Sequence, residues 1–143
     1  MKKISAFFCL FVSILSALCQ NVKNKISIIP EPVKITEKPG SFTLPSNIVI
    51  EAPSQPALKE TVDFLKQKLS VATGCRVNVS NKEGNGTIKL ILNATENKEI
   101  GNEGYQLLVS PTTVLIKANK PAGLFYGAQT LVQLFPEEIE SSI

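Results

Sequence analysis

Apolar residues recur with a helical period in two stretches of the chain. The first stretch runs from about Pro56 to about Ala72, and its apolar stripe is Leu58, Val62, Leu65 and Leu69, widened by Phe64. The second stretch follows Asn119, and its stripe is Leu124, Ala128, Leu131 and Phe135. Residues three, four and seven positions apart share one face of an α-helix. The pattern therefore predicts two amphipathic helices, each with one side packed on a core.

Residues suited to helix ends flank both stripes. Ser54 can cap the start of the first helix, and Gly74 can adopt the left-handed conformation that ends it. Asn119 can cap the second helix, Pro121 suits its first turn, and Pro136 stops it. We therefore expect well-defined ends for both helices.

Short apolar or alternating runs predict strands in the rest of the chain. The runs before the first helix are separated by prolines and cover residues 26–29, 33–35, 41–44 and 47–50. The later runs cover residues 76–79, 87–92, 105–109 and 114–118. The last two runs, joined by residues 110–113, form the clearest hairpin. The turn signal at residues 84–86 suggests that the strands at 76–79 and 87–92 also form an antiparallel pair.

The order of these elements is strands, helix, strands, helix. Such an order predicts an α+β fold, with one mainly antiparallel sheet and two helices packed on one face. The length of 143 residues suits one domain.

Residues 1–19 have the composition of a secretory signal peptide. Two lysines precede an apolar run at residues 4–18, which is too short to span a membrane. Cleavage before Gln20 would release a soluble exported protein, periplasmic or extracellular. The alternative is lipidation at Cys19, which would make the protein a lipoprotein, although the preceding leucine suits a lipidation motif poorly.

The mature chain lacks the residue types of several function classes. Removing residues 1–19 removes two lysines and no acid, so the formal charge falls from +3 to +1. A nearly neutral surface gives no electrostatic reason to expect nucleic acid or an anionic membrane as partner. Histidine is absent and Cys75 is the one cysteine after the signal, so we expect no metal site and no cofactor.

The acidic residues do not suggest a catalytic pair. Asp63 is the only aspartate, and its position on the solvent side of the first helix suggests a surface ion pair with Lys66. Glu137 and Glu138 are neighbours, but they follow the end of the last helix and suit a solvated linker. Cys75 suits a small buried apolar position better than a reactive thiol.

Two glycines and two aromatic residues mark the last helix. Gly123 and Gly127 share one face, where each costs roughly 1 kcal/mol relative to alanine. We interpret them as positions that let another backbone approach closely. Phe125 and Tyr126 could stack on a sugar ring, but Phe125 better suits a position in or beside the core.

The sequence Glu103-Gly104-Tyr105 leads into the first strand of the predicted hairpin. We expect Gly104 to supply an unusual backbone angle and Tyr105 to pack at the edge of the sheet.

Four short sequence motifs, in the same order along the chain, resemble the N-terminal accessory domain of glycoside hydrolase family 20, the β-N-acetylhexosaminidases. They are Ile28-Ile29-Pro30-Glu31-Pro32-Val33, Gly40-Ser41-Phe42-Thr43-Leu44, Glu103-Gly104-Tyr105-Gln106-Leu107, and the last strand and helix from Ile116 to Leu134. Together they cover nearly the whole mature chain.

The resemblance implies an exported enzyme that removes terminal N-acetylhexosamine from glycoconjugates by substrate-assisted retaining catalysis. The family's catalytic Asp-Glu pair lies on a separate barrel. This chain contains no Asp-Glu dipeptide and no histidine, so no family catalytic residue matches a position here. We expect the chain alone to be inactive.

The resemblance also implies a domain organisation. Residues 20–136 would form the accessory domain, and residues 137–143 would begin a linker to a catalytic barrel absent from this chain. Residues of the last helix would pack against that barrel: Gly123, Phe125, Tyr126 and Gly127. The alternative is a stand-alone module that binds carbohydrate or another protein.

Overall fold

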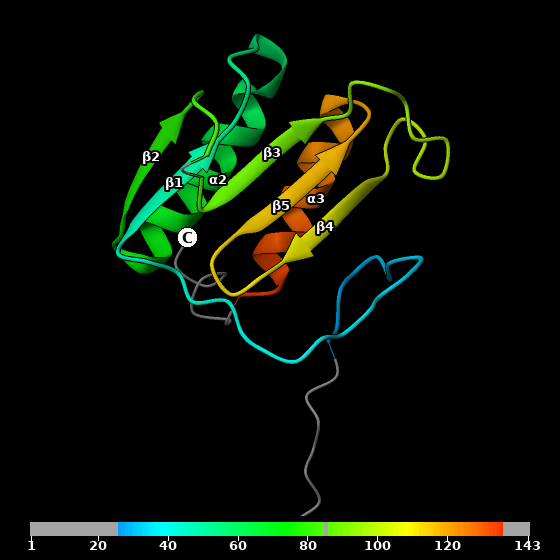
Figure 1. Ribbon diagram of the computed structural model, residues 1–143. Coiled ribbons are helices and arrows are strands. Elements are labelled where there is room, and N and C mark those ends of the chain that lie inside the picture. The colour runs from blue at the N-terminus through cyan, green and yellow to red at the C-terminus, as the bar shows by residue number, and fades with distance from the viewer. Residues whose placement is uncertain (1–25, 85, 136–143) are drawn as a thin grey trace, which may run out of the picture.

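The computed structural model describes residues 26–84 and 86–135, and Figure 1 shows them as one sheet with helices behind it. The predicted signal peptide at 1–19 with Cys19 and Gln20, the turn residue Asn85, the helix stop Pro136 and the linker at 137–143 lie outside the described residues. The elements are β1 (Asn47–Glu51), a short 3-10 helix η1 (Pro56–Leu58), α2 (Lys59–Thr73), β2 (Arg76–Ser80), β3 (Ile88–Leu92), β4 (Tyr105–Val109), β5 (Val114–Ala118) and α3 (Pro121–Gln133).

The described strands form one mixed sheet in the order β2-β1-β3-β5-β4. The pairs β1–β2, β1–β3 and β3–β5 are parallel, and only β4–β5 is antiparallel. The α+β class is confirmed, but the prediction of a mainly antiparallel sheet is wrong. Parallel neighbours require a crossover connection, and α2 provides one because it returns the chain to the end of the sheet where β1 began.

The predicted antiparallel pair of residues 76–79 with 87–92 is also wrong. Both segments are strands, but β1 lies between them and pairs with each in parallel. The predicted hairpin of residues 105–109 and 114–118 is confirmed, with Tyr105 opposite Ala118 and Val109 opposite Val114.

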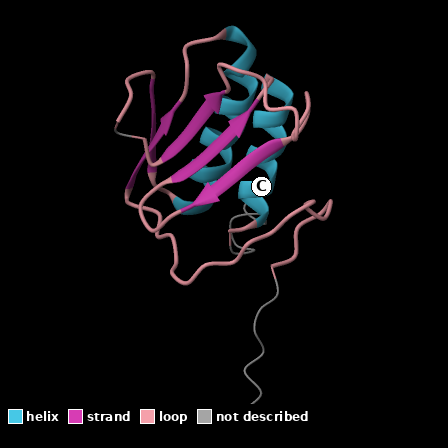
Figure 2. Ribbon diagram, turned by 45° about the vertical axis from the view of Figure 1, so that its right-hand side comes forward, coloured by secondary structure: helices cyan, strands magenta, loops and turns pink. Residues whose placement is uncertain are grey.

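The helices follow the predicted stripes and pack on the same face of the sheet, as Figures 1 and 2 show. Both α-helices, the short helix η1 and the inner sheet face contribute fully buried side chains: Leu58, Leu65, Leu69, Leu124, Ala128, Leu131, Ile48, Ile50, Ile88, Leu90, Val114 and Ile116. Two members of the predicted stripes, Val62 and Phe135, are half-buried against this core. The helical period therefore identified the buried faces correctly.

The helix ends agree with the prediction only in part. Gly74 ends α2 in the left-handed conformation with φ 64°, and its N–H donates to the carbonyl of Ser70. Pro121 occupies the first turn of α3. The predicted side-chain caps are absent: η1 precedes α2 in place of a cap by Ser54, and Lys120 stands at the N-cap position of α3 in place of Asn119.

Residues 26–46, which we call the N-terminal strap, form no strand. The predicted strands at 26–29, 33–35 and 41–44 are therefore wrong, and only the run at 47–50 becomes β1. The prolines in the strap lack the N–H group that a ladder requires, so alternation alone could not add these segments to the sheet. Figure 1 shows the strap (blue to cyan) passing the foot of the domain below the end of α3.

Candidate functional site

The two glycines of α3 face the sheet. A Cβ atom on Gly123 would come within 3.0 Å of the carbonyl oxygen of Gly104 and of the Cβ of Ala118. A Cβ on Gly127 would lie 2.5 Å from Cγ2 of Ile116. The predicted close approach of another backbone is therefore present at Gly123, and that backbone belongs to the same domain. Contact of these glycines with a catalytic barrel remains a prediction, and the contacts within the domain already account for their small size.

Gly104 is required for space and not for its backbone angle. It is not among the described residues with positive φ, so the predicted unusual angle is wrong. Its N–H donates to the carbonyl of Ile100 at 2.9 Å, and a Cβ on Gly104 would collide with that carbonyl. A glycine here lets the chain turn tightly before β4.

Tyr105 packs where the sequence predicted, on the edge strand β4. Its hydroxyl lies 2.5 Å from Oγ1 of Thr130, and its ring covers Gly127. Thr130 is buried, so the hydrogen bond satisfies a polar group that water cannot reach. The edge strand is thereby attached to the middle of α3.

Three aromatic residues form a surface shared by the two helices, which we call the aromatic helix face: Phe64, Phe125 and Tyr126. The ring of Phe125 lies 5.4 Å from that of Phe64 and 6.4 Å from that of Tyr126, measured between centroids. Phe125 is half-buried beside Phe64, which itself packs against the core, whereas Tyr126 is 43% exposed. The pair Phe125 and Tyr126 lines a hollow of about 170 Å³ between the starts of α2 and α3.

Asn119 organises the long loop between β3 and β4. Its Nδ2 donates to the carbonyls of Asn97 at 2.8 Å and Gly101 at 2.6 Å. Its Oδ1 accepts from Nδ2 of Asn93 and from the N–H of Asn97, both at 2.8 Å. Only 8% of Asn119 is exposed. The position of Asn119 before Pro121 predicts a helix cap and does not reveal this network, although several asparagines at strand ends were a signal for it.

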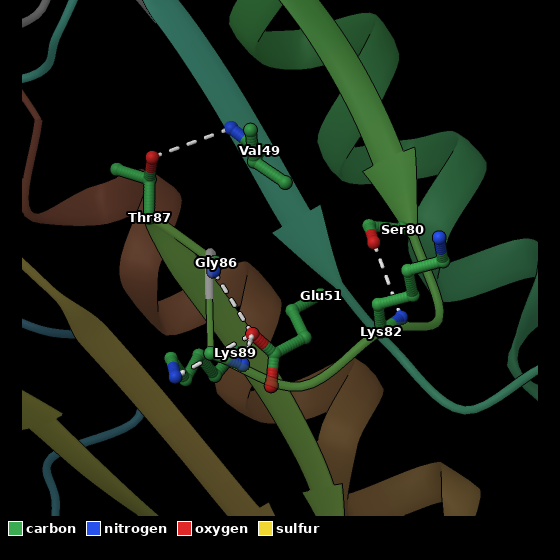
Figure 3. Close-up of polar contacts among 8 residues, drawn as sticks. Val49, Glu51, Ser80, Lys82, Gly86, Thr87 and Lys89 are labelled. Atoms are coloured by element: carbon green, nitrogen blue, oxygen red, sulfur yellow. Dashed lines mark hydrogen bonds and ion pairs between the residues drawn. The ribbon is translucent and has the colours of Figure 1, made fainter.

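Glu51 organises the loop that leads into β3, as Figure 3 shows. Its Oε2 accepts hydrogen bonds from the N–H groups of Gly84 at 3.1 Å and Gly86 at 2.9 Å, and lies 3.4 Å from Nζ of Lys89. Gly86 lies so close that a Cβ there would collide with the Glu51 side chain. The sequence predicted a turn at residues 84–86, but it did not show that the carboxylate of Glu51 holds this turn.

The remaining candidates for chemistry have structural surroundings. Asp63 forms a surface ion pair as predicted, but its partner is Lys59 rather than Lys66. The hydrogen bond to this carboxylate, and then its charge, raise the pKa of Lys59 above its ordinary value of 10.5. Cys75 is a free thiol, half-buried against the core. Glu137 and Glu138 lie outside the described residues.

The described residues offer no cluster of three or more Cys, Asp or Glu residues that could hold a metal ion. Within the same part of the chain, no helix is both long and apolar enough to span a membrane. Another surface hollow, about 560 Å³, is lined by residues that include the paired Lys59 and Asp63.

Comparison with known proteins gives consistent matches. Residues 25–143 match the family described as Glycosyl hydrolase family 20, domain 2. A β-hexosaminidase of Porphyromonas gingivalis is 32% identical over 117 residues, which are 82% of this chain and 15% of that protein. A mutant β-hexosaminidase of Streptomyces plicatus, solved with the product GlcNAc, is 34% identical with a TM-score of 0.72, over 79% of this chain and 22% of that chain.

A β-N-acetylhexosaminidase of Bacteroides fragilis is 27% identical, with a TM-score of 0.58 over 74% of this chain and 20% of that chain. The chain described here thus spans less than a quarter of the length of each of these relatives.

Proposed function

This chain belongs to glycosyl hydrolase family 20, as its domain 2, and from this membership we propose that it is the non-catalytic accessory domain of an exported β-N-acetylhexosaminidase. The observation that carries the proposal is the match of residues 25–143 to that domain, together with similar β-hexosaminidases several times longer than the matched segment.

The proposed parent enzyme removes terminal N-acetylhexosamine from glycans with retention of configuration. The acetamide oxygen of the sugar attacks its own anomeric carbon and forms an oxazolinium ion. A glutamate protonates the leaving oxygen, and a neighbouring aspartate orients the acetamide. The sequence described here has no Asp-Glu dipeptide and no histidine, so these groups would come from the barrel.

The proposed partner of the domain is this catalytic barrel, which would lie in the same polypeptide. The aromatic helix face supports the contact because it presents the exposed ring of Tyr126 beside a hollow lined by Phe125, Pro121 and Ala122. Aromatic side chains bury large areas and are enriched in protein interfaces. The domain would contribute structure to the enzyme rather than a reacting group.

Export of the protein is a further part of the proposal and rests on residues 1–19. Mass spectrometry of the secreted protein tests it. A chain that begins at Gln20 supports cleavage by signal peptidase, and a diacylated Cys19 supports the lipoprotein alternative. A secreted or membrane-attached form that retains Met1 contradicts both.

The function is tested with the purified chain and a chromogenic N-acetyl-β-glucosaminide. We expect no turnover by the chain alone, and turnover that copurifies with the chain through gel filtration would contradict a non-catalytic domain. The aromatic helix face, as the surface that would contact the barrel, is tested by the fluorescence of a hydrophobic dye. Wild type is expected to bind the dye and Tyr126→Ser to bind less, whereas Val79→Ser, an exposed substitution on β2, provides the matched control.

A stand-alone carbohydrate-binding module is the competing function. Glycan-array binding by wild type that disappears in Tyr126→Ala would favour it over the accessory-domain proposal.

A further inference from the structure

The hollow of about 560 Å³ is a crevice at the carboxyl ends of β1 and β2. These parallel strands end level with each other, since Glu51 is the partner of Ser80 in their register. The connection after β1 runs along the helix face of the sheet as α2. The loop after β2 crosses the opposite face, because Glu51, which follows the buried Ile50, points there and binds Gly84 and Gly86 (Figure 3). In mostly parallel sheets, connections that diverge in this way leave a crevice in which ligands bind.

The crevice has the size of a ligand site and an apolar lining beneath its rim. Binding sites for small molecules range from about 300 to 1,000 Å³ and combine apolar walls with a few polar groups. The lining includes the buried side chains of Ala52 and Leu58 and the half-exposed side chain of Val79. The N–H of Ala52 donates to the carbonyl of Ser80 at 3.0 Å, so the two strand ends are joined under the crevice. The walls are therefore part of the rigid sheet and not of a free loop.

Three polar side chains that line the crevice are not used by the fold. Within the described part of the chain, the side chains of Ser54, Gln55 and Asn81 make no hydrogen bond. Ser54 was predicted to cap the first helix, but η1 precedes α2 instead, so its hydroxyl stays available. Hydroxyl and amide groups both donate and accept hydrogen bonds. The crevice therefore presents groups that match a ligand rich in hydroxyls.

The charges of the crevice favour such a ligand over an anion. Two lysines line it, Lys59 and Lys82, but Lys59 is paired with Asp63. Phosphate-binding sites gather several unpaired donors around the anion. With one lysine neutralised by an acid in the same lining, the crevice offers little net charge and mainly uncharged donors and acceptors.

We propose that this crevice binds one unit of an oligosaccharide. The hydroxyl of Ser54 and the amides of Gln55 and Asn81 exchange hydrogen bonds with sugar hydroxyls, and the C–H groups of the ring lie on Val79 and Pro53. Because the crevice is open to solvent, a longer glycan can continue on either side of the bound unit. The site shares no lining residue with the hollow beside Tyr126, so it is separate from the aromatic helix face.

This inference rests on the proposed function, in which the parent enzyme acts on glycans. A glycan held at a second point has its free end kept at a high effective concentration near the enzyme. The accessory domain would thus bind an inner part of the same chain whose terminal sugar the barrel removes. It would contribute to the capture of long substrates without contributing a reacting group.

The test is an NMR titration of the purified, ¹⁵N-labelled chain with the β-1,4-linked trimer of N-acetylglucosamine. We expect saturable shifts of the backbone amides at residues 54–55 and 79–82. An open crevice loses part of its binding energy to competing water, so we expect a Kd of about 1 mM. The proton spectrum of the same sample also reports any free N-acetylglucosamine that the chain releases.

A double variant and a matched control make the result specific. Gln55→Ala/Asn81→Ala removes two of the hydrogen-bonding side chains and should weaken binding roughly tenfold. Asn102→Ala/Gln106→Ala removes the same two residue types from exposed positions at and before β4, the opposite edge strand from β2, and should bind as wild type does. All four side chains are exposed, so both variants should keep the dispersed spectrum of the folded chain.

The outcomes separate this inference from the proposed function. No saturable shift in wild type, or the same Kd in Gln55→Ala/Asn81→Ala, overturns the oligosaccharide site and leaves the accessory-domain proposal standing. Shifts at the crevice with inorganic phosphate but not with the trimer show an anion site and also overturn it. Binding that is lost in Tyr126→Ala and kept in Gln55→Ala/Asn81→Ala overturns it in favour of the aromatic helix face. Release of N-acetylglucosamine by the chain contradicts the proposed function itself.

Discussion

The carbonyl oxygen of Gly104 occupies the space where a side chain on Gly123 would begin. Gly104 immediately precedes β4, and Gly123 lies in the first turn of α3, so the first turn of the last helix lies against the start of the edge strand. Neither residue can carry a Cβ unless a backbone segment moves. A Cβ on Gly123 would meet the Gly104 carbonyl, and a Cβ on Gly104 would meet the Ile100 carbonyl.

We predict that Gly123→Ala lowers the free energy of unfolding by about 1–3 kcal/mol, because backbone must shift to accept the methyl group. Gly127→Ala should cost less, since its neighbours are the side chains of Ile116 and Tyr105. Urea denaturation measures both. Ala122→Gly, at an exposed position of the same helix, gives the effect of helix propensity alone, about 1 kcal/mol. A Gly123→Ala protein more stable than wild type would contradict the packing described.

Tyr105→Phe should lower the free energy of unfolding by about 1–2 kcal/mol, because it leaves the buried hydroxyl of Thr130 without its partner. Thr130→Val removes the other half of the pair. In a double-mutant cycle the combined variant should cost less than the sum of the single variants, and strict additivity would show that the hydrogen bond contributes nothing.

Asn119→Ala should release the loop between β3 and β4. Four hydrogen bonds are lost and their loop partners are left partly buried, so we expect a cost of about 2–4 kcal/mol. Hydrogen exchange should quicken first at the amide of Asn97, which loses its acceptor. Asn119→Asp keeps the acceptor but not the donors, and an effect as small as that of an exposed substitution would argue against the network.

Glu51→Gln should be milder than Glu51→Ala. The amide oxygen of glutamine can still accept from Gly84 and Gly86, so the main loss is the ion pair with Lys89, whereas alanine leaves both N–H groups without an acceptor. We expect the free energy of unfolding to fall by about 1 kcal/mol in Glu51→Gln and by about 2–3 kcal/mol in Glu51→Ala. Thermal unfolding at low and high salt checks this, because only the part due to the ion pair should shrink with salt.

Lys59 should titrate above 10.5, because the hydrogen bond to Asp63 and then the charge of its carboxylate raise its pKa. A lysine pKa raised by folding contributes stability below the unfolded pKa and loses that contribution as the pH rises through the folded pKa. Both side chains of the pair are largely exposed to solvent, so the contribution is small. An NMR titration of the Lys59 Cε measures it. The same pKa in Asp63→Asn as in wild type would contradict the assignment.

The elements that rest on local patterns could be predicted from the sequence. The periods of α2 and α3, the left-handed glycine at 74 and the hairpin of β4 and β5 each depend on residues close in the chain. The pairing of β1 with both β2 and β3 does not depend on residues that are close in the chain. No residue in β2 or β3 specifies that a third strand lies between them, because that position is decided by how α2 packs across the sheet.

The glycines of α3 show the same limit within the candidate site. Their spacing indicated a close approach, which the structure confirms at Gly123, but the sequence did not identify the approaching backbone as that of Gly104. Asn119 is the opposite case: its residue type suits both a helix cap and a loop anchor, and only the folded loop decides between them. The predicted strands of the N-terminal strap are wrong because an alternating pattern indicates which side chains are exposed. It does not show whether another strand pairs with the segment.

The strand order has a consequence for the way the chain is synthesised. The central strand β3 has its two neighbours on opposite sides in the sequence, β1 before it and β5 after it. On a ribosome, which releases the chain from its N-terminus, β3 stays open along one edge until Ala118 has emerged. That unpaired edge is a site for wrong association during translation. The arrival of β5 closes it, and the next residues to emerge, those of α3, then cover the face of the sheet that β5 has completed.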